Sequence, residues 1–419
     1  MLYKIKIVFT DRELRNRILF VLGALVVFRL LAAVPIPGID TVRLSQFLSS
    51  NQFFGVLNIF SGGGLSNLSI IMMGVGPYIT ASIILQLLTI MIPALKALNE
   101  EGEAGKRKLT NYSRLLSVPL AALQGFGLLT LLAREGIVGD LSVMGWVTSI
   151  SVIIAGSMLL MWIGELISEH GIGNGVSLLI FAGIISSLPS QVSQLLFTFD
   201  VSQLPLYLAF IVGAILIIAG VIFITEAERP VPVTYAKQVR GMKTYGGVST
   251  YIPLRLNQAG VIPIIFALSI LMFPRIIGTV LVGSSNAVIA RIGTSFSSFT
   301  EASVGYTVAY FLLVFLFTYF YTAVTFDPNQ MATNLQKNGA FIPGIRPGQP
   351  TAEHVAKILN RITLFGALFL GIIAILPLVL RGVTGIAGLA LGGTALLIVV
   401  SVVLDLIKKI DSQISMKEY

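Results

Sequence analysis

The sequence predicts an all-α polytopic membrane protein with ten transmembrane helices in two pseudo-symmetric halves of five, together with one re-entrant segment. Of its 419 residues, 55% are hydrophobic and only 11% are charged, whereas a soluble domain averages about 25% charged residues. Apolar runs long enough to cross a hydrocarbon core of roughly 30 Å recur about ten times along the chain. One uncharged stretch, 44–95, is too long for one span and too rich in glycine for two.

The apolar runs give the span positions in chain order. We place them at about 18–34, 69–92, 115–133, 147–168, 175–196, 204–225, 258–281, 303–325, 360–380 and 387–405. The N-terminal half is then 1–196, with five spans, and the C-terminal half is 197–419, with five more. A half with an odd number of spans inverts its topology when it is repeated, and Gly/Pro interruptions in the second and seventh spans are consistent with such a repeat.

The stretch 44–95 has two unlike parts. Residues 70–91 are apolar and can span, but 58–67 contain three consecutive glycines and two asparagines, which disfavour a helix and add polar groups. Non-helical backbone occurs at membrane depth only where protein buries it or where it lines a cavity. The residues leave two interpretations: a stopper inside a pore made by the other helices, or a loose external loop on the bilayer surface.

The basic residues predict the orientation. Of the 28 Lys and Arg residues, 22 fall in the two terminal arms and the even-numbered loops, and five fall in the odd-numbered loops. Because basic loops stay in the cytoplasm, both termini are predicted to be cytoplasmic. The remaining residue, Arg29, lies near the end of the first span.

Two cytoplasmic loops are unusually long. The loop at about 226–256 alternates apolar and polar residues on either side of Gly246-Gly247, which predicts a β-hairpin. The loop at about 326–358 has a turn-rich tip, 341–348, with Arg346 at its centre. Both loops could be solvated connectors, but ordered loops of about 30 residues usually have a function. We therefore favour a docking surface.

Chemistry-bearing residues are scarce in the spans. Glu165 lies near the cytoplasmic end of its span and Asp405 at the end of the last, and no predicted span has a central acid. Coupled ion transport is therefore disfavoured. There is no cysteine, His170 and His354 lie far apart, and protease and Walker A motifs are absent from the sequence. We predict no catalytic residue, metal site or cofactor, and a passive channel rather than an enzyme. A solute transporter and a non-conducting scaffold are the alternatives.

Seven short stretches in this order resemble the SecY/Sec61-alpha family, the channel subunits of the Sec protein translocase. They are 35–40 (PIPGID), 60–63 (FSGG), 77–79 (PYI), 171–175 (GIGNG), 259–263 (AGVIP), 341–348 (FIPGIRPG) and 392–400 (GGTALLIVV). Each is weak alone, but together on ten predicted spans they are specific. The resemblance implies two clamshell halves hinged between the fifth and sixth spans.

The resemblance also implies the functional residues. It implies a pore closed by a ring of six aliphatic side chains, namely Val75, Ile79, Val176, Ile180, Ile265 and Ile398. It makes the glycine-rich segment, about 53–67, a plug, with Phe60, Ser61, Gly62, Gly63, Gly64, Leu65, Ser66 and Asn67 at its core. It implies a lateral gate between spans 2 and 7 that opens toward lipid, with a polar cluster of Thr80, Gln124 and Asn257.

The function implied by the resemblance is a gated channel in the bacterial plasma membrane for unfolded preproteins and for signal sequences. The implied partners are the small subunits SecE and SecG, the SecA motor and the ribosome, which the cytoplasmic loops would dock through Arg240, Lys243 and Arg346. This chain departs from the family pattern at Val75 and Val176, where isoleucine is common. At the tip of the first long cytoplasmic loop the family usually has two adjacent basic residues. This chain has Met242-Lys243 there.

Overall fold

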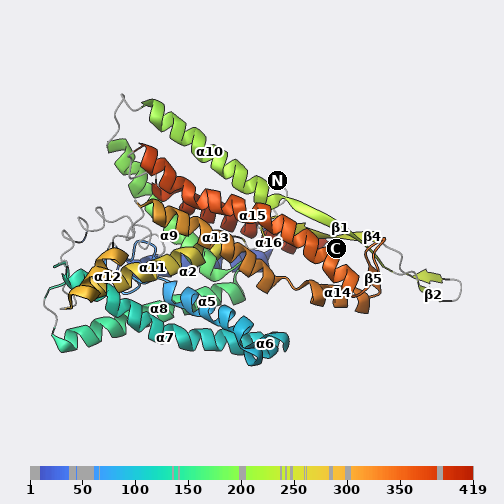
Figure 1. Cartoon of the computed structure of the whole chain (residues 1–419), viewed down its shortest axis with the longest axis horizontal. Helices are drawn as coiled ribbons and strands as arrows, with labels where there is room; N and C mark the ends of the chain where they lie inside the picture. The colour runs from blue at the N-terminus through green and yellow to red at the C-terminus, as the bar shows by residue number, and fades with distance from the viewer. Residues whose placement is uncertain are drawn as a thin grey trace.

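The protein, seen in a computed structural model, is a bundle of long helices with a small β-sheet projecting from one end (Figure 1). The structure describes residues 10–36, 44, 61–65, 67–134, 136–139, 142–197, 204–235, 238–240, 243–245, 249–258, 260, 262–282, 286–297, 303–384 and 390–418. Its helices are α2 (Arg12–Ala32), α5 (Gly76–Met91), α6 (Pro93–Glu100), α7 (Glu103–Arg134), α8 (Val143–His170), α9 (Gly175–Phe197), α10 (Leu204–Glu226), α11 (Ile262–Val282), α12 (Ala287–Ser297), α13 (Val304–Thr325), α14 (Pro328–Lys337), α15 (Gln349–Thr384) and α16 (Ala390–Glu418).

Several helices begin at a polar cap that the sequence supplies. Asp11 caps α2 by accepting from the amide of Glu13 at 2.8 Å, and Asp327 caps α14 in the same way. Ser142 and Ser303 cap α8 and α13 through their hydroxyl groups. These side chains satisfy amides that the first helical turn leaves without a partner.

Each predicted span overlaps one helix, but several boundaries were wrong. The second span was predicted to begin at residue 69, whereas Ser69 forms an isolated β-bridge with Pro35, residues 70–75 form turns and α5 begins at Gly76. Gly74 has a φ of 58°, which a helix does not accept, and Pro77 favours a helix start. Helices α7 and α15 begin 12 and 11 residues before the predicted spans because they continue beyond the apolar run.

Only some of these helices are both long enough and apolar enough to cross a membrane. In the described part of the chain, four stretches are long and apolar enough to cross a membrane by themselves: Glu103–Ala133, Val143–His170, Val304–Lys337 and Gln349–Leu376. The bent pair formed by α5 and α6 would make a fifth. The prediction of several apolar helices is confirmed, and the number ten stays a prediction.

The predicted β-hairpin is confirmed and extended. Strand β1 (Glu228–Tyr235) pairs antiparallel with β4 (Ser249–Arg255), with Val231 opposite Ile252. Between them, β2 (Gln238–Arg240) and β3 (Lys243–Tyr245) form a second, smaller hairpin. Strand β5 (Ala340–Phe341), from the second long loop, pairs with the other edge of β1. That loop is therefore more ordered than a turn-rich connector, since it holds α14 and β5, and α15 starts within it.

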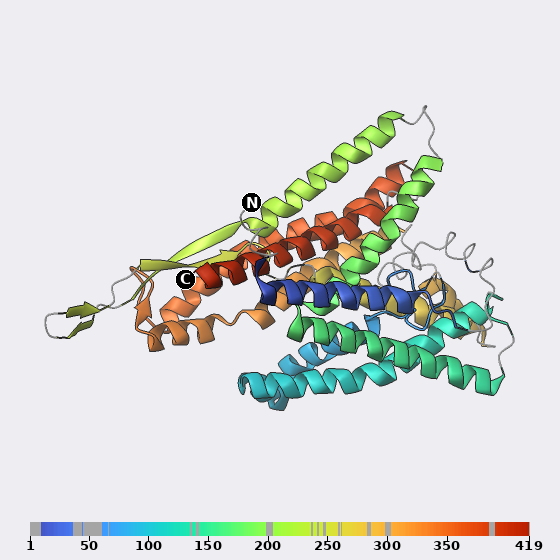
Figure 2. The same cartoon turned by 180° about the vertical axis from the view of Figure 1, so that it is seen from behind.

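The hydrophobic cores follow this arrangement. One cluster joins helices of both predicted halves, including α9, α11, α13, α15 and α16. A second lies within the N-terminal part, between α7, α8 and residues 65–73. A third joins the sheet to the start of α15 through Val233, Ala340 and Val355. In both views the start of α2, the end of α16, α6 and the sheet lie at one end of the bundle, and α12 lies at the other (Figures 1 and 2).

Candidate functional site

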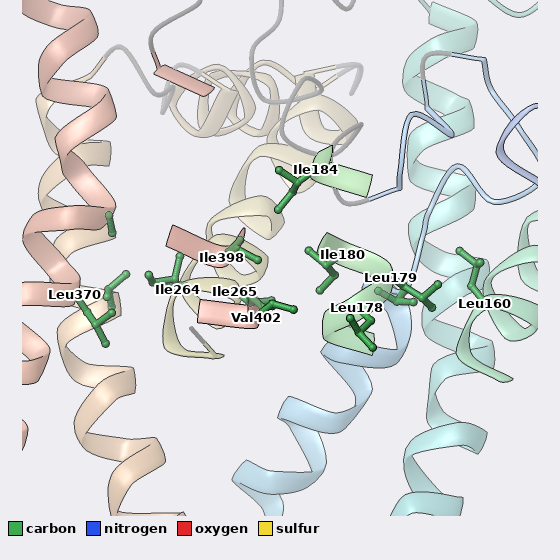
Figure 3. Close-up of a cluster of buried hydrophobic side chains, with 14 of the residues drawn as sticks. Leu160, Leu178, Leu179, Ile180, Ile184, Ile264, Ile265, Leu370, Ile398 and Val402 are labelled. Carbon is green, nitrogen blue, oxygen red and sulfur yellow. The ribbon is translucent and has the colours of Figure 1, made fainter. Parts of the chain in front are cut away.

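The six aliphatic residues proposed as a ring meet in one hydrophobic cluster. Val75, Ile180, Ile265 and Ile398 are buried in it, and Ile79 and Val176 are half-buried against it. They come from four helices that are distant in sequence: α5, α9, α11 and α16. In Figure 3, Ile265 and Ile398 lie on one side of the cluster and Ile180 on the other. An aliphatic cluster of this kind excludes water and ions.

Backbone features at the starts of α5 and α9 position four of these side chains. Val75 is the N-cap of α5, and its carbonyl accepts from the amide of Ile79 at 3.0 Å, so both residues share one face. Val176 and Ile180 are likewise one turn apart in α9. The start of α9 lies close against α8, because a Cβ on Gly175 would be 1.8 Å from the carbonyl oxygen of Gly164. Only glycine permits this approach.

The described part of the proposed plug, 61–65 and 67, is buried backbone rather than a surface loop. Ser61, Gly62, Gly64 and Leu65 are buried, and the Ser61 hydroxyl oxygen accepts from the amide of Leu65 at 3.1 Å. Of the remaining plug residues, Asn67 is exposed, Gly63 is half-buried, and Phe60 and Ser66 lie outside the described residues, as does 53–59. The burial disagrees with the alternative of a loose loop on the bilayer surface.

The last turns of α2 hold this segment. The guanidinium of Arg29 donates from Nη1 to the carbonyl oxygen of Gly62 at 2.8 Å, and the side-chain amide of Asn67 donates to the carbonyl of Ala32 at 3.3 Å. The ring of Phe28 lies directly against Gly62. Sequence reasoning did not assign Phe28 or Arg29 to this site. The available signal was Arg29 itself, a cation inside an otherwise apolar span.

The backbone between the segment and α5 is also fixed by protein contacts. The amide of Ile36 donates to the carbonyl of Leu68, and the amide of Ile70 donates to that of Val34. On the other side, a Cβ on Gly156 of α8 would be 1.9 Å from the carbonyl oxygen of Ile70. Residues 68–70 thus lie between α8 and the residues that follow α2, and the chain continues from them to Val75.

The proposed gate cluster is assembled only in part. Thr80 of α5, Gln124 of α7 and Asn257 just before α11 are all buried, and α11 contacts both α5 and α7. The Gln124 amide donates to the Thr80 hydroxyl oxygen at 3.5 Å, which is a long hydrogen bond. Asn257 instead donates to the carbonyl of Gly260 at 3.1 Å, and its Oδ1 is buried without a hydrogen-bond partner among the described residues.

The acidic residue Glu165 forms an ion pair within the bundle. Glu165 of α8 accepts from Nε of Arg114 in α7 at 2.7 Å, and the carboxylate side chain is 19% exposed. A second Arg114 nitrogen donates to Asn111. Glu165 therefore ties α7 to α8 rather than facing an ion path as an unpaired carboxylate.

The proposed docking residues lie at the sheet end of the bundle. Arg346 is exposed, and its carbonyl accepts from the Thr351 hydroxyl at 2.8 Å. Gly344 and Gly348 flank it with φ angles of 81° and 96°, so the tip needs glycine at both positions. Arg240 and Lys243 face each other across the β2–β3 pair, although their side chains lie outside the described part of the structure.

Comparison with known proteins identifies the family. The profile of the SecY family matches residues 69–407. The chain is 42% identical over 430 residues to a protein named protein translocase subunit SecY from Mycobacterium tuberculosis, covering 97% of this chain and 96% of that protein. It is 42% identical over 419 residues to the protein of the same name from Thermus thermophilus, covering 97% of this chain and 94% of that protein.

Solved structures agree on the fold. A structure described as a protein conducting channel superposes with a TM-score of 0.61 at 18% identity, covering 94% of this chain and 91% of that one. A structure reported for the plug domain of the SecY protein superposes with a TM-score of 0.60 and the same coverage. With a matching profile over most of the chain and relatives at 42% identity over nearly its full length, this chain belongs to the SecY family.

Proposed function

We propose that this chain is the channel subunit of a protein translocase, a passive pore through which unfolded preproteins cross the membrane. The observation that carries the proposal is the junction of the glycine segment with the aliphatic cluster. Buried irregular backbone leads directly into Val75, and four helices bring six aliphatic side chains together beside it. A cluster without charges can open around a chain of mixed composition, and it blocks ions when closed because a narrow apolar neck dewets.

In this proposal the glycine segment is the plug and the six aliphatic residues are the closing ring. The burial of 61–65 supports the assignment, because a stopper must be packed in protein in the closed state. The many polar backbone contacts of the segment also support it. They replace the hydration that this backbone would have in water, and they can be exchanged for water when the segment moves.

The lateral gate in this proposal is the contact of α11 with α5 and α7. Parting these helices opens the bundle toward lipid, so that signal sequences and membrane segments can leave sideways. The hydrogen bond from Gln124 to Thr80 and the hydrogen bond from Asn257 to the carbonyl of Gly260 stabilise this closed contact. A hydrophobic signal sequence then competes for the same surface.

The remaining assignments belong to the same proposal. The chain has ten spans, divided as 1–196 and 197–419, with both termini cytoplasmic in a bacterial plasma membrane. It has no enzymatic activity of its own, and the driving force comes from the SecA motor or from the ribosome, which bind the cytoplasmic end. A homologous fold described as Sec61 in a canine ribosome-channel complex supports the ribosome as a partner. SecE and SecG are the expected small membrane subunits.

The deciding experiment places a photoreactive amino acid at Ile79 or Ile265 and arrests a preprotein during transport. The proposal predicts crosslinks from both positions to the arrested chain. A matched probe at Phe365, which is exposed on α15, should crosslink to lipid. A transporter or a scaffold predicts no crosslinks from Ile79 or Ile265 to the preprotein, and that result would overturn the proposal.

A further inference from the structure

Arg29 is the basic residue that the charge-based topology leaves outside every loop. In the structure its Nη1 donates to the carbonyl oxygen of Gly62 at 2.8 Å and to the hydroxyl oxygen of Ser186 at 3.2 Å. Gly62 lies in the glycine segment and Ser186 in α9. One guanidinium therefore joins α2, the glycine segment and α9, three parts of the chain that are far apart in sequence.

The partners of Arg29 suit a cation that must stay in place. The Ser186 hydroxyl donates its only proton to the carbonyl of Gly183 at 2.8 Å, so its oxygen is left to accept from Arg29. Arg29 is also in the last turn of α2, where the helix carbonyls favour a positive charge. Among the described residues no carboxylate is within ion-pair distance of Arg29, so neutral oxygens hold the charge.

The packing beneath the hydrogen bond fixes its geometry. Phe28, next to Arg29, is buried against Gly62, and Asn67 reaches back to the carbonyl of Ala32 one turn later. The glycine segment is thus attached to α2 at three successive places. Of these, Arg29 is the only one whose hydrogen bond is charge-assisted, and such bonds are about twice as strong as neutral ones.

We propose that Arg29 is the positioning residue that anchors the plug to α2 and α9 in the closed channel. This inference rests on the proposed function only in taking the glycine segment as the plug. Displacing the segment breaks the bond to Gly62, whereas the bond between α2 and α9 through Ser186 can remain. Arg29 thereby sets part of the threshold for opening without itself lining the aliphatic ring.

The absence of cysteine from the sequence allows a direct test. Leu65, which is 1% exposed, is replaced by cysteine in the full chain, and its labelling by a water-soluble maleimide is timed in the resting channel. We expect Arg29→Gln to speed labelling by about tenfold, as the loss of one charge-assisted hydrogen bond allows. Arg29→Lys, which keeps the positive charge but lacks the planar guanidinium, should lie between. Ser186→Ala should give a smaller increase of roughly two- to threefold.

Arg291→Gln is the matched control. Arg291 is exposed on α12, at the same end of the bundle as the last turn of α2 (Figure 2). Its side chain has no hydrogen bond to the described part of the glycine segment, so Arg291→Gln removes a charge from this end without removing a bond to that part of the segment. Labelling should then equal that of the parent. Equal rates in the parent, Arg29→Gln and Arg29→Lys would overturn the anchor. Deleting 62–66 tests the plug separately, through the ion leak of the deletion variant. If that leak is unchanged while Arg29→Gln still speeds labelling at position 65, the anchor is supported and the plug function is overturned.

Discussion

The ring of Phe28 occupies the space that a side chain at Gly62 would need: a Cβ built on Gly62 lies 2.2 Å from Cζ of Phe28. Gly62 also has a φ of 67°, which costs a non-glycine residue roughly 1–2 kcal/mol. We therefore expect Gly62→Ala to loosen the segment and raise ion leak in planar bilayers. Gly23→Ala is the control, since Gly23 lies in α2 with nothing within 4 Å of its Cβ position. Parental leak in Gly62→Ala would show that the segment does not seal the channel.

Polar substitution of the aliphatic ring should hydrate it. Replacing Ile79, Ile265 and Ile398 together by serine introduces hydroxyl groups where an apolar neck would dewet, so resting conductance should rise. Ile264→Ser is the control for simple core damage, because Ile264 is 0% exposed in the same cluster but is not a ring residue. It should lower thermal stability without a comparable leak. Equal conductance in the triple variant and the parent would contradict the ring.

The gate residues should differ in their effects. Thr80 keeps a hydrogen bond to the carbonyl of Gly76 at 3.0 Å when Gln124 is removed, so Gln124→Leu should cost at most about 1 kcal/mol. Asn257→Leu removes the only described side-chain donor to the carbonyl of Gly260, next to the start of α11. It should shift the channel toward opening and lower the hydrophobicity that a signal sequence needs. The measurement is transport efficiency over a graded series of signal sequences, and an unchanged threshold in Asn257→Leu would count against the gate assignment.

Arg346 should matter through its position rather than through total charge. Arg346→Glu should leave insertion intact, because the tip lies at the sheet end of the bundle, but should abolish motor-driven transport into vesicles. Arg346→Lys should be partly active, since lysine lacks the planar guanidinium. Arg107→Glu supplies the control: Arg107 is exposed near the start of α7 and lies on the same predicted side. If Arg346→Glu transports as well as Arg107→Glu, the tip is only a connector.

Hydropathy predicted where the helices lie but not where they begin and end. Membrane spans are visible in the sequence because lipid selects apolar residues over about 20 positions. The N-terminal parts of α7 and α15 carry charged residues such as Lys106 and Glu353, so no apolar run marks them. The start predicted for α5 was too early because the backbone at Gly74 and Pro77 delays the helix within a continuous apolar run.

The contacts that build the site were less visible. The ring and gate residues came from the family resemblance, because an isoleucine facing the ring has the same local pattern as one facing lipid. The bond from Arg29 to Gly62 joins residues 33 positions apart, and no periodicity reports such a contact. Likewise, the two residues of β5 are too short to give a strand signal, and only their pairing with β1 defines them.

That pairing has a consequence for how the chain is made. Strand β1 leaves the ribosome about 100 residues before β5, so a growing chain holds an unfinished sheet while α11 and α13 are still being inserted. The hydrophobic cluster that supports the sheet is also incomplete until Val355 and Ile362 of α15 have been synthesised. The exposed Arg346 tip is therefore presented on a complete support only after most of the chain has been synthesised. In the proposed function, a half-built channel could not yet recruit its driving partner through this surface, so assembly of the bundle would precede its use.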